Sequence, residues 1–251
     1  NEGSAYVAGD DALWMADDQS DSLLEVDRTT GALRRRIPQA AFIYSRSVGG
    51  GPAAGQTRNE DLEALAYDAD ADVLYAFSGV TPWGPSGQRQ PSFPTVYRLA
   101  RVAGEFQVAS WRALPSEWTG AGWRAADGRT YVASRSNIRT YDYTTNTLGA
   151  PFSIPGLSKI LGIDFGGVTG DLLAVSKENR LYRASMASTT LRAGWDGISL
   201  TGLGLRDTRA VEVIGEQLFV SDGADARVRP TTDPMSHAVF VLDVTTDTTG
   251  P

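Results

Sequence analysis

The 251-residue chain contains no cysteine, and histidine occurs once, at His237. The absence of cysteine excludes disulfides, thiolate nucleophiles, cysteine-ligated zinc and iron–sulfur clusters. A single histidine excludes metal sites built on several histidines, and a Ser–His–Asp triad would have to use this residue. No run of about 18 apolar residues is present, so no segment is predicted to cross a membrane. The sequence also carries no haem, flavin or nucleotide signature.

Positive charge is scarce as well, because 23 Lys and Arg stand against 30 Asp and Glu, which gives a formal net charge of −7. A surface that binds nucleic acid needs positive charge to neutralise phosphates, so nucleic acid is not an expected partner. Glycine is abundant, at 27 residues, and 12 prolines accompany it. This composition favours short strands joined by tight turns.

One pair of strands recurs along the chain. In its clearest copy, residues 62–67 and 73–77 form short apolar runs around an Asp-rich turn, which predicts a β-hairpin. Related hairpins begin near residues 4, 120, 160 and 208. An all-strand repeat with a period of roughly 40–50 residues predicts sheets stacked around a shared axis.

We therefore expect an all-β fold consisting of a single β-propeller. Five blades of mostly four antiparallel strands are expected over residues 1–244, and six blades is the alternative. Residues 245–251 are expected to form a tail or a linker, and no fourth strand is evident for the last blade. The sequence does not explain how the ring would close.

The predicted connections differ in length between the two faces of the propeller. Short turns join strands 1 to 2 and 3 to 4, and we call the face that carries them the plain face. The long connections all fall on the opposite face, here called the loop-rich face: residues 38–58, 79–94, 194–207 and 222–236. Since loops usually carry function, a binding site is expected on the loop-rich face. Tolerated insertions are the alternative explanation.

Charged residues are predicted to meet where the first strands open onto the loop-rich face. The repeats are aligned on Ala64, Gly122, Gly162 and Ala210. One level of the ring then contains Asp61, Thr119, Lys159 and Asp207. The next level contains Glu63, Ala121, Leu161 and Arg209, with Glu2 or Ser4 in the first blade.

The carboxylates of Asp61, Glu63 and Asp207 would repel one another at this place. Two carboxylates about 4 Å apart repel by roughly 4 kcal/mol at an effective dielectric constant of 20, so a cation is needed. Calcium is one candidate, because it takes several hard oxygen ligands. Lys159 and Arg209 are the other candidates, and they are already present in the chain.

Further residues on the loop-rich face complete the candidate site. Asp18 follows a second strand, so it joins Asp61, Glu63 and Asp207 as a predicted calcium ligand, although Asp residues also cap strand ends. Trp83 lies in a Pro- and Gly-rich loop and could stack on a flat ligand. The predicted ligand-binding residues are Trp83, Arg209, Lys159 and Tyr44.

Four stretches of the first two blades resemble the SdiA-regulated propeller family and are similar to esterase-like phytases. They are residues 12–18, 23–27, 31–38 and 61–68. The families carry an Asp-x-Glu-Gly-[Ile/Leu]-Ala-Tyr stretch, in which Ala64 here replaces the Gly. Leu161 and Arg209 stand where the family repeats the Glu. The resemblance implies a five-bladed propeller, often outside the cytoplasm, with calcium binding and no settled activity.

Three functions are compatible with these patterns, and whether the protein is an enzyme stays open. The first is an extracytoplasmic or secreted propeller that binds a small ligand, an ion or a protein partner through its loop-rich face, with calcium as a candidate ion. The second is a calcium-dependent hydrolase of phosphoesters or lactones. The third is a structural domain of a larger surface protein. The chain begins at Asn1 without a charged and apolar leader, as a mature secreted chain or a trimmed chain would.

Overall fold

The computed structural model describes residues 2–17, 20–45, 56–58, 61–79, 94–166, 170–223 and 239–243. These residues form five main antiparallel sheets and one short hairpin. The first sheet contains β1 (Ser4–Val7), β2 (Ala12–Asp17), β3 (Ser22–Asp27) and β4 (Leu33–Ile37). The second contains β7 (Leu62–Asp68), β8 (Val73–Ser78), β9 (Thr95–Val102) and β10 (Glu105–Ala113).

The remaining sheets follow in sequence order. The third contains β11 (Gly120–Arg124), β12 (Arg129–Ser134), β13 (Asn137–Asp142) and β14 (Thr147–Leu148). The fourth contains β15 (Ile160–Gly166), β16 (Asp171–Ser176), β17 (Arg180–Ser185) and β18 (Thr190–Ser199). The described part of the fifth contains β19 (Thr208–Ile214), β20 (Gln217–Asp222) and β21 (Val239–Asp243). The hairpin consists of β5 (Ile43–Ser45) and β6 (Gln56–Arg58).

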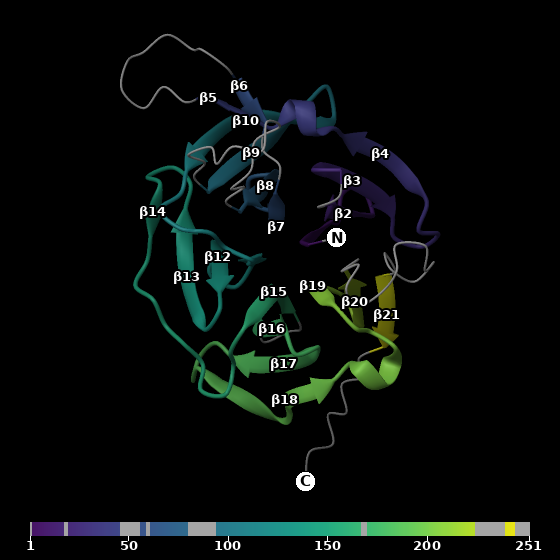
Figure 1. Ribbon diagram of the computed structural model, residues 1–251, viewed down its shortest axis with the longest axis vertical. Helices are drawn as coiled ribbons and strands as arrows, with labels where there is room; N and C mark the ends of the chain where they lie inside the picture. Colours follow the sequence, from purple (N-terminus) through teal and green to yellow (C-terminus); the bar gives the residue numbers. More distant parts are fainter. Residues whose placement is uncertain are drawn as a thin grey trace, which may run out of the picture.

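The five sheets are arranged as a closed ring (Figure 1). Their first strands contact one another in the order β1, β7, β11, β15, β19 and back to β1. Within each sheet the strands are paired in sequence order. The molecule is therefore a β-propeller of five blades, numbered here 1 to 5 along the chain, and the predicted fold class is confirmed.

Burial within a blade decreases from the second strand to the fourth. Every residue of β8 and β16 is buried, whereas β4, β10 and β18 expose many of their residues. A second strand has neighbouring blades on both faces, so both of its faces are apolar and simple alternation is lost. This is the reason that Val73–Ser78 and Asp171–Ser176 read as nearly continuous apolar runs.

The connections between blades fill the seams, by which we mean the packed spaces between neighbouring blades. Each of the first four seams receives two buried apolar side chains from its connection or, for Ile37, from the end of the strand before it: Ile37 and Phe42, Leu114 and Trp118, Ile154 and Leu157, and Leu200 and Leu205. At the seam between blades 5 and 1, the buried cluster of the described residues is Leu13, Met15 and Phe219. A groove of about 620 Å³ opens beside this cluster. Counting the described residues alone, the seam between the first and last blades has the smallest buried apolar cluster.

Two predicted boundaries are wrong. With four strands in each blade, the apolar residues after the third strand of blade 3 predict a fourth strand over residues 148–154, but β14 has only two residues, and a single bridge joins Phe152 to Ile138. The sequence also predicts a loop over residues 194–207, whereas β18 continues to Ser199 and the short 3-10 helix η2 (Thr201–Leu203) follows. Gly194 and Gly197 fit into β18 because they lie where its register with β17 shifts.

The described residues contain two helices, η1 (Gln39–Ala41) and η2, and no helix among them could cross a membrane. The predicted tail, residues 245–251, lies outside the described residues.

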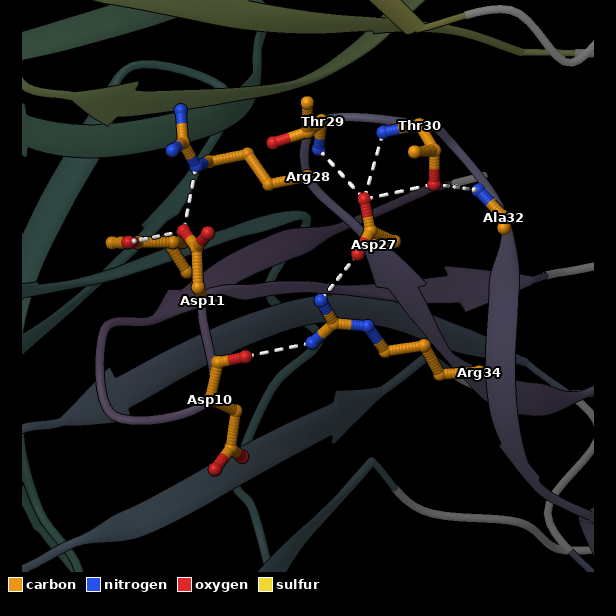
Figure 2. Close-up of polar contacts among 9 residues, drawn as sticks. Asp10, Asp11, Asp27, Arg28, Thr29, Thr30, Ala32 and Arg34 are labelled. Carbon is orange, nitrogen blue, oxygen red and sulfur yellow. Dashed lines mark hydrogen bonds and ion pairs between the residues drawn. The ribbon is translucent and has the colours of Figure 1, made fainter.

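The plain face uses its polar groups within its own turns, as Figure 2 shows for blade 1. The Asp27 carboxylate accepts hydrogen bonds from the N–H groups of Thr29 and Thr30 and from the Thr30 hydroxyl, and it pairs with Arg34. These donors, the Thr30 N–H first among them, hold the pKa of Asp27 well below its usual range. Asp142 caps the equivalent turn of blade 3 in the same way.

Candidate functional site

Hydrogen bonds of the backbone place three of the predicted residues at equivalent positions. In blades 2, 4 and 5, the residue that follows the second strand donates its N–H to a carbonyl just before the first strand. The bonds join Gly79 to Asp61 (2.7 Å), Lys177 to Lys159 (2.9 Å), and Gly223 to Asp207 (2.6 Å). Asp61, Lys159 and Asp207 therefore share one level of the ring, which confirms this part of the alignment.

A β-bulge follows two residues later in the same three blades. The pairing of the first and second strands shifts at Glu63, at Leu161 and at Arg209. A bulge leaves its extra residue unpaired in the ladder and changes the direction of its side chain. The second predicted level of the ring thus coincides with a repeated irregularity of the backbone.

Blade 3 is displaced by two residues from the predicted alignment. Gly120 pairs with Ala133, the residue that precedes the last residue of its strand, just as Ala64 pairs with Phe77. Gly120, and not Gly122, is therefore equivalent to Ala64. As a consequence, Thr119 belongs to the level of Glu63, and the predicted placement of Ala121 at that level is wrong.

The same correction brings another acid, Glu117, to the level of Asp61 in blade 3. In blade 1, Ala16 donates its N–H to the carbonyl of Gly3 (2.8 Å), which makes Gly3 equivalent to Ala64 and Glu2 equivalent to Glu63. Of the two residues considered for blade 1, Glu2 therefore completes the ring.

We call the group formed by Glu2, Asp61, Glu63, Asp207 and Arg209 the acidic mouth. The Arg209 guanidinium is its centre: Nε and Nη2 donate to the two oxygens of Asp207 (3.0 and 2.9 Å), and Nη1 donates to Glu2 (2.8 Å). Such a two-pronged pair fixes geometry as well as charge. Burial alone would lower the pKa of Arg209, but Glu2, Asp207 and Glu63 raise it above its usual value. Arg209 is thus permanently charged.

The pKa of Glu63, in the acidic mouth, is strongly raised. Burial, followed by the negative charges of Asp61, Glu2 and Glu117, raises the pKa of Glu63 to about 9. The Glu63 carboxyl also has a hydrogen bond with Asp61. At neutral pH this carboxyl therefore holds a proton.

Glycine keeps space open beside these acids. A Cβ atom at Gly79 would collide with the Asp61 carboxylate and lie 3.1 Å from Glu63 Oε1. A Cβ at Gly223, the equivalent position in blade 5, would lie 2.9 Å from Asp207 Oδ2. Both positions immediately follow a second strand, so the absence of side chains there lets the Asp61 and Asp207 carboxylates pack against the backbone.

The other predicted residues are spread more widely. Lys159 does not balance the acidic mouth, because its ammonium group pairs with Glu178 at an exposed position. Asp18 and Trp83 lie outside the described residues, and of Tyr44 only the backbone, in β5, is described. The roles expected of these residues stay predictions.

Calcium also stays a prediction. Within the described ranges, no three His, Asp or Glu side chains are grouped so that they could hold a metal ion. Asp61, Glu63 and Asp207 share one end of the axis, but Asp207 is held by Arg209.

A second acidic group lies deeper along the axis, and the sequence analysis missed it. Asp164 on β15 and Glu212 on β19, here called the axial carboxyl pair, are each 8% exposed and line a cavity of about 240 Å³. Asp164 accepts a hydrogen bond from the N–H of Val213 (2.7 Å), and Glu212 accepts one from the N–H of Tyr6 (2.7 Å). Each carboxyl thus joins its blade to the next one.

Burial governs the titration of the axial carboxyl pair. It raises the pKa of Asp164 to about 7, although the N–H groups of Val213 and Phe165 oppose the shift. Burial, and then the neighbouring Asp164, raise the pKa of Glu212 well above its usual value. The signal in the sequence was a charged residue inside an apolar strand at the same repeat position of blades 4 and 5.

Comparison with known proteins shows the fold. No family model matches the chain, and no curated protein matches it. A glutaminyl cyclase of Myxococcus xanthus is 10% identical over 87% of this chain and 84% of its own, with a TM-score of 0.60. A chain of a nidogen–laminin complex is 14% identical over 97% of this chain and 75% of its own, with a TM-score of 0.55.

These identities are too low to transfer an activity, so they support the propeller fold and nothing finer. The resemblance to the SdiA-regulated family has no support from them and stays a prediction.

Proposed function

We propose that the protein is a binding protein whose acidic mouth takes a small ligand with a positive charge. One observation carries this proposal: at one end of the axis, the carboxyl groups outnumber the single guanidinium of Arg209. The carboxyl groups are those of Glu2, Asp61, Glu63 and Asp207. A cation would relieve their repulsion in place of the proton on Glu63.

An organic cation fits this arrangement better than calcium. Calcium takes about six to eight oxygen ligands at short distances, and the described residues offer no such convergent group. An ammonium or guanidinium group, in contrast, can hydrogen-bond to carboxylates that lie apart. Calcium is kept as a second probe, because acidic residues outside the described ranges were predicted to contribute.

Proton release tests the proposal. Titration calorimetry with putrescine and, separately, calcium chloride should detect saturable binding at about pH 8. If the cation displaces the Glu63 proton, affinity should rise about tenfold per pH unit below the pKa of Glu63, so about 100-fold between about pH 6 and 8.

Variants separate this site from general charge effects. Glu63→Gln should remove the pH dependence, while Glu216→Gln, which removes the same charge from an exposed turn of the plain face, should leave it unchanged. Absence of saturable binding by either probe at about pH 8 would overturn the proposal. Binding that Glu63→Gln leaves equally pH-dependent would overturn the assigned site.

Secretion, a calcium-dependent hydrolase activity and a role within a larger surface protein remain predictions from the sequence.

A further inference from the structure

A second hollow of opposite charge opens at the seam between blades 3 and 4. It has a volume of about 700 Å³. Its charged lining residues include Arg135, Lys159 and Lys177, and we call it the basic pocket. Lys159 and Lys177 are the only lysines of the chain, which otherwise carries a net negative charge. Both therefore line one pocket of an acidic protein.

The backbone holds these three cationic residues together. Ile160 donates its N–H to the carbonyl of Arg135 (2.8 Å), and Lys177 donates its N–H to the carbonyl of Lys159 (2.9 Å). Arg135 and Lys159 also adopt the left-handed conformation, with φ of 59° and 52°. That conformation is unfavourable for residues other than glycine, and it persists only where surrounding contacts impose it. The three positions are thus fixed relative to one another.

Two of the three cations are unengaged within the part of the chain that the structure describes. Neither the Arg135 guanidinium nor the Lys177 ammonium has an ion pair or a side-chain hydrogen bond there, whereas Lys159 pairs with Glu178. Arginines elsewhere are mostly held: Arg101, Arg124, Arg183, Arg192 and Arg209 each form ion pairs. The basic pocket therefore keeps cationic donors available.

Hydroxyl groups complete the lining. Ser134, Ser136 and Ser158 line the pocket beside the cations. A smaller hollow of about 340 Å³ adjoins the basic pocket. It is also lined by Arg135 and Ser134, and in addition by Arg139. Glu117 also lines both hollows and opposes an anion, so the three cations exceed the lining acids by two. Arginine, lysine and serine donors together are the groups that hold phosphoryl oxygens in proteins.

We propose that the basic pocket binds a small oxyanion, with a phosphoryl group as its chemical class. The proposal does not depend on the acidic mouth, because it uses different residues and the opposite charge. Together, the two sites would let the loop-rich face accept a ligand with a positive and a phosphorylated end.

The test measures inorganic phosphate binding to the full chain at low ionic strength by ³¹P NMR titration. Saturable binding is expected for the unchanged protein. Lys177→Gln and Arg135→Gln should each weaken it by about tenfold or more, since each removes a charge-assisted contact. Arg129→Gln is the matched control, because it removes an equal charge from an exposed residue at the start of β12. It should leave the affinity unchanged.

Several outcomes would overturn the assignment. They are no saturable phosphate binding, equal weakening by Arg129→Gln, and saturable binding of acetate without binding of phosphate. Circular dichroism checks that the variants fold, and all three substituted side chains are exposed. Putrescine binding in the Lys177→Gln variant distinguishes the two sites: it should persist whether or not phosphate binds.

Discussion

Two groups of carboxyl side chains lie along the propeller axis, one at its loop-rich end and one inside it. The acidic mouth is partly open, and its charges act mainly on one another and on Arg209. The axial carboxyl pair is closed in, and its oxygens accept N–H groups of the next blade. Burial is the first cause of the raised carboxyl pKa values in both arrangements, but at the mouth the charges of Asp61, Glu2 and Glu117 add to it, whereas in the axial pair backbone N–H groups oppose it. We propose that the crowded charges mark a place for a ligand, whereas the backbone partners of the axial pair form a joint between blades.

The largest difference should appear when Arg209 is removed. Arg209→Gln leaves Asp207 and Glu2, which are 16% and 11% exposed, without their counter-ion. Loss of one partner of a buried ion pair typically costs about 3–5 kcal/mol, so the free energy of unfolding should fall by about that much. Urea denaturation at neutral pH measures this change.

Arg206→Gln is the control for that variant, because Arg206 is exposed in the same blade. It should change stability by less than about 0.5 kcal/mol. If Arg209→Gln also lowers the free energy of unfolding by less than about 0.5 kcal/mol, the ion pairs of Arg209 do not stabilise the acidic mouth.

The axial carboxyl pair should respond in the opposite direction. The folded chain retains a proton that an unfolded Asp releases near its model value of 3.8, so stability should fall as pH rises from about 4 towards about 7. Asp164→Asn imitates the protonated state and should raise the free energy of unfolding at about pH 8 by up to about 4 kcal/mol. Thermal unfolding at several pH values measures the effect.

Asp171 gives the matching contrast for Asp164→Asn. It is 2% exposed in the same blade, but it pairs with Arg183 and Arg192. Asp171→Asn should therefore destabilise the protein. If Asp164→Asn and Asp171→Asn both raise or both lower the free energy of unfolding at about pH 8, the conclusion that Asp164 is destabilised by burial while Asp171 is stabilised by its ion pairs is wrong.

A smaller effect is expected for Glu63. Glu63→Gln keeps the protonated form of a carboxyl that is less deeply buried, so it should stabilise the unliganded protein by up to about 3 kcal/mol at neutral pH. Chemical denaturation with and without the variant tests this. A decrease in stability would mean that an ionised Glu63 is needed to hold Arg209.

Salt should produce the smallest effect. At about 0.5 M salt, repulsion in the partly open mouth is screened, whereas the closed axial pair is screened much less. Stability should therefore rise by a few tenths of a kcal/mol, and at about pH 10, where Glu63 is ionised, Glu63→Gln should reduce this rise while Asp164→Asn should not. The reverse pattern of the two variants would contradict the distinction.

The sequence was sufficient to predict the fold because each blade repeats a recognisable hairpin. It also predicted the common level of Asp61, Lys159 and Asp207. The predicted register of blade 3 was wrong because Gly120 and Gly122 are two residues apart. A shift by two residues keeps every side chain of a strand on the same face, so the sequence pattern fits both registers. Hydrogen bonds of the backbone were needed to choose between them.

The binding sites were harder to predict than the ring. Lys159 pairs with Glu178, a residue that follows a different strand. The basic pocket forms only when blades 3 and 4 pack together. Likewise, Asp164 and Glu212 are far apart in sequence and become neighbours only through the stacking of β15 and β19. Such pairings are set by packing between repeats, which no single repeat encodes.

The short N-terminal segment contacts both groups of carboxyl side chains on the axis. Glu2 reaches Arg209, and Tyr6 reaches Glu212, so both axial groups extend across the junction between the first and last blades. Among the residues that the structure describes, that junction also has the smallest buried apolar cluster. A molecule bound at Glu2 and Arg209 would hold the first and last blades together. Its binding should then be measurable as a slower rate of unfolding, even if no other part of the protein changes.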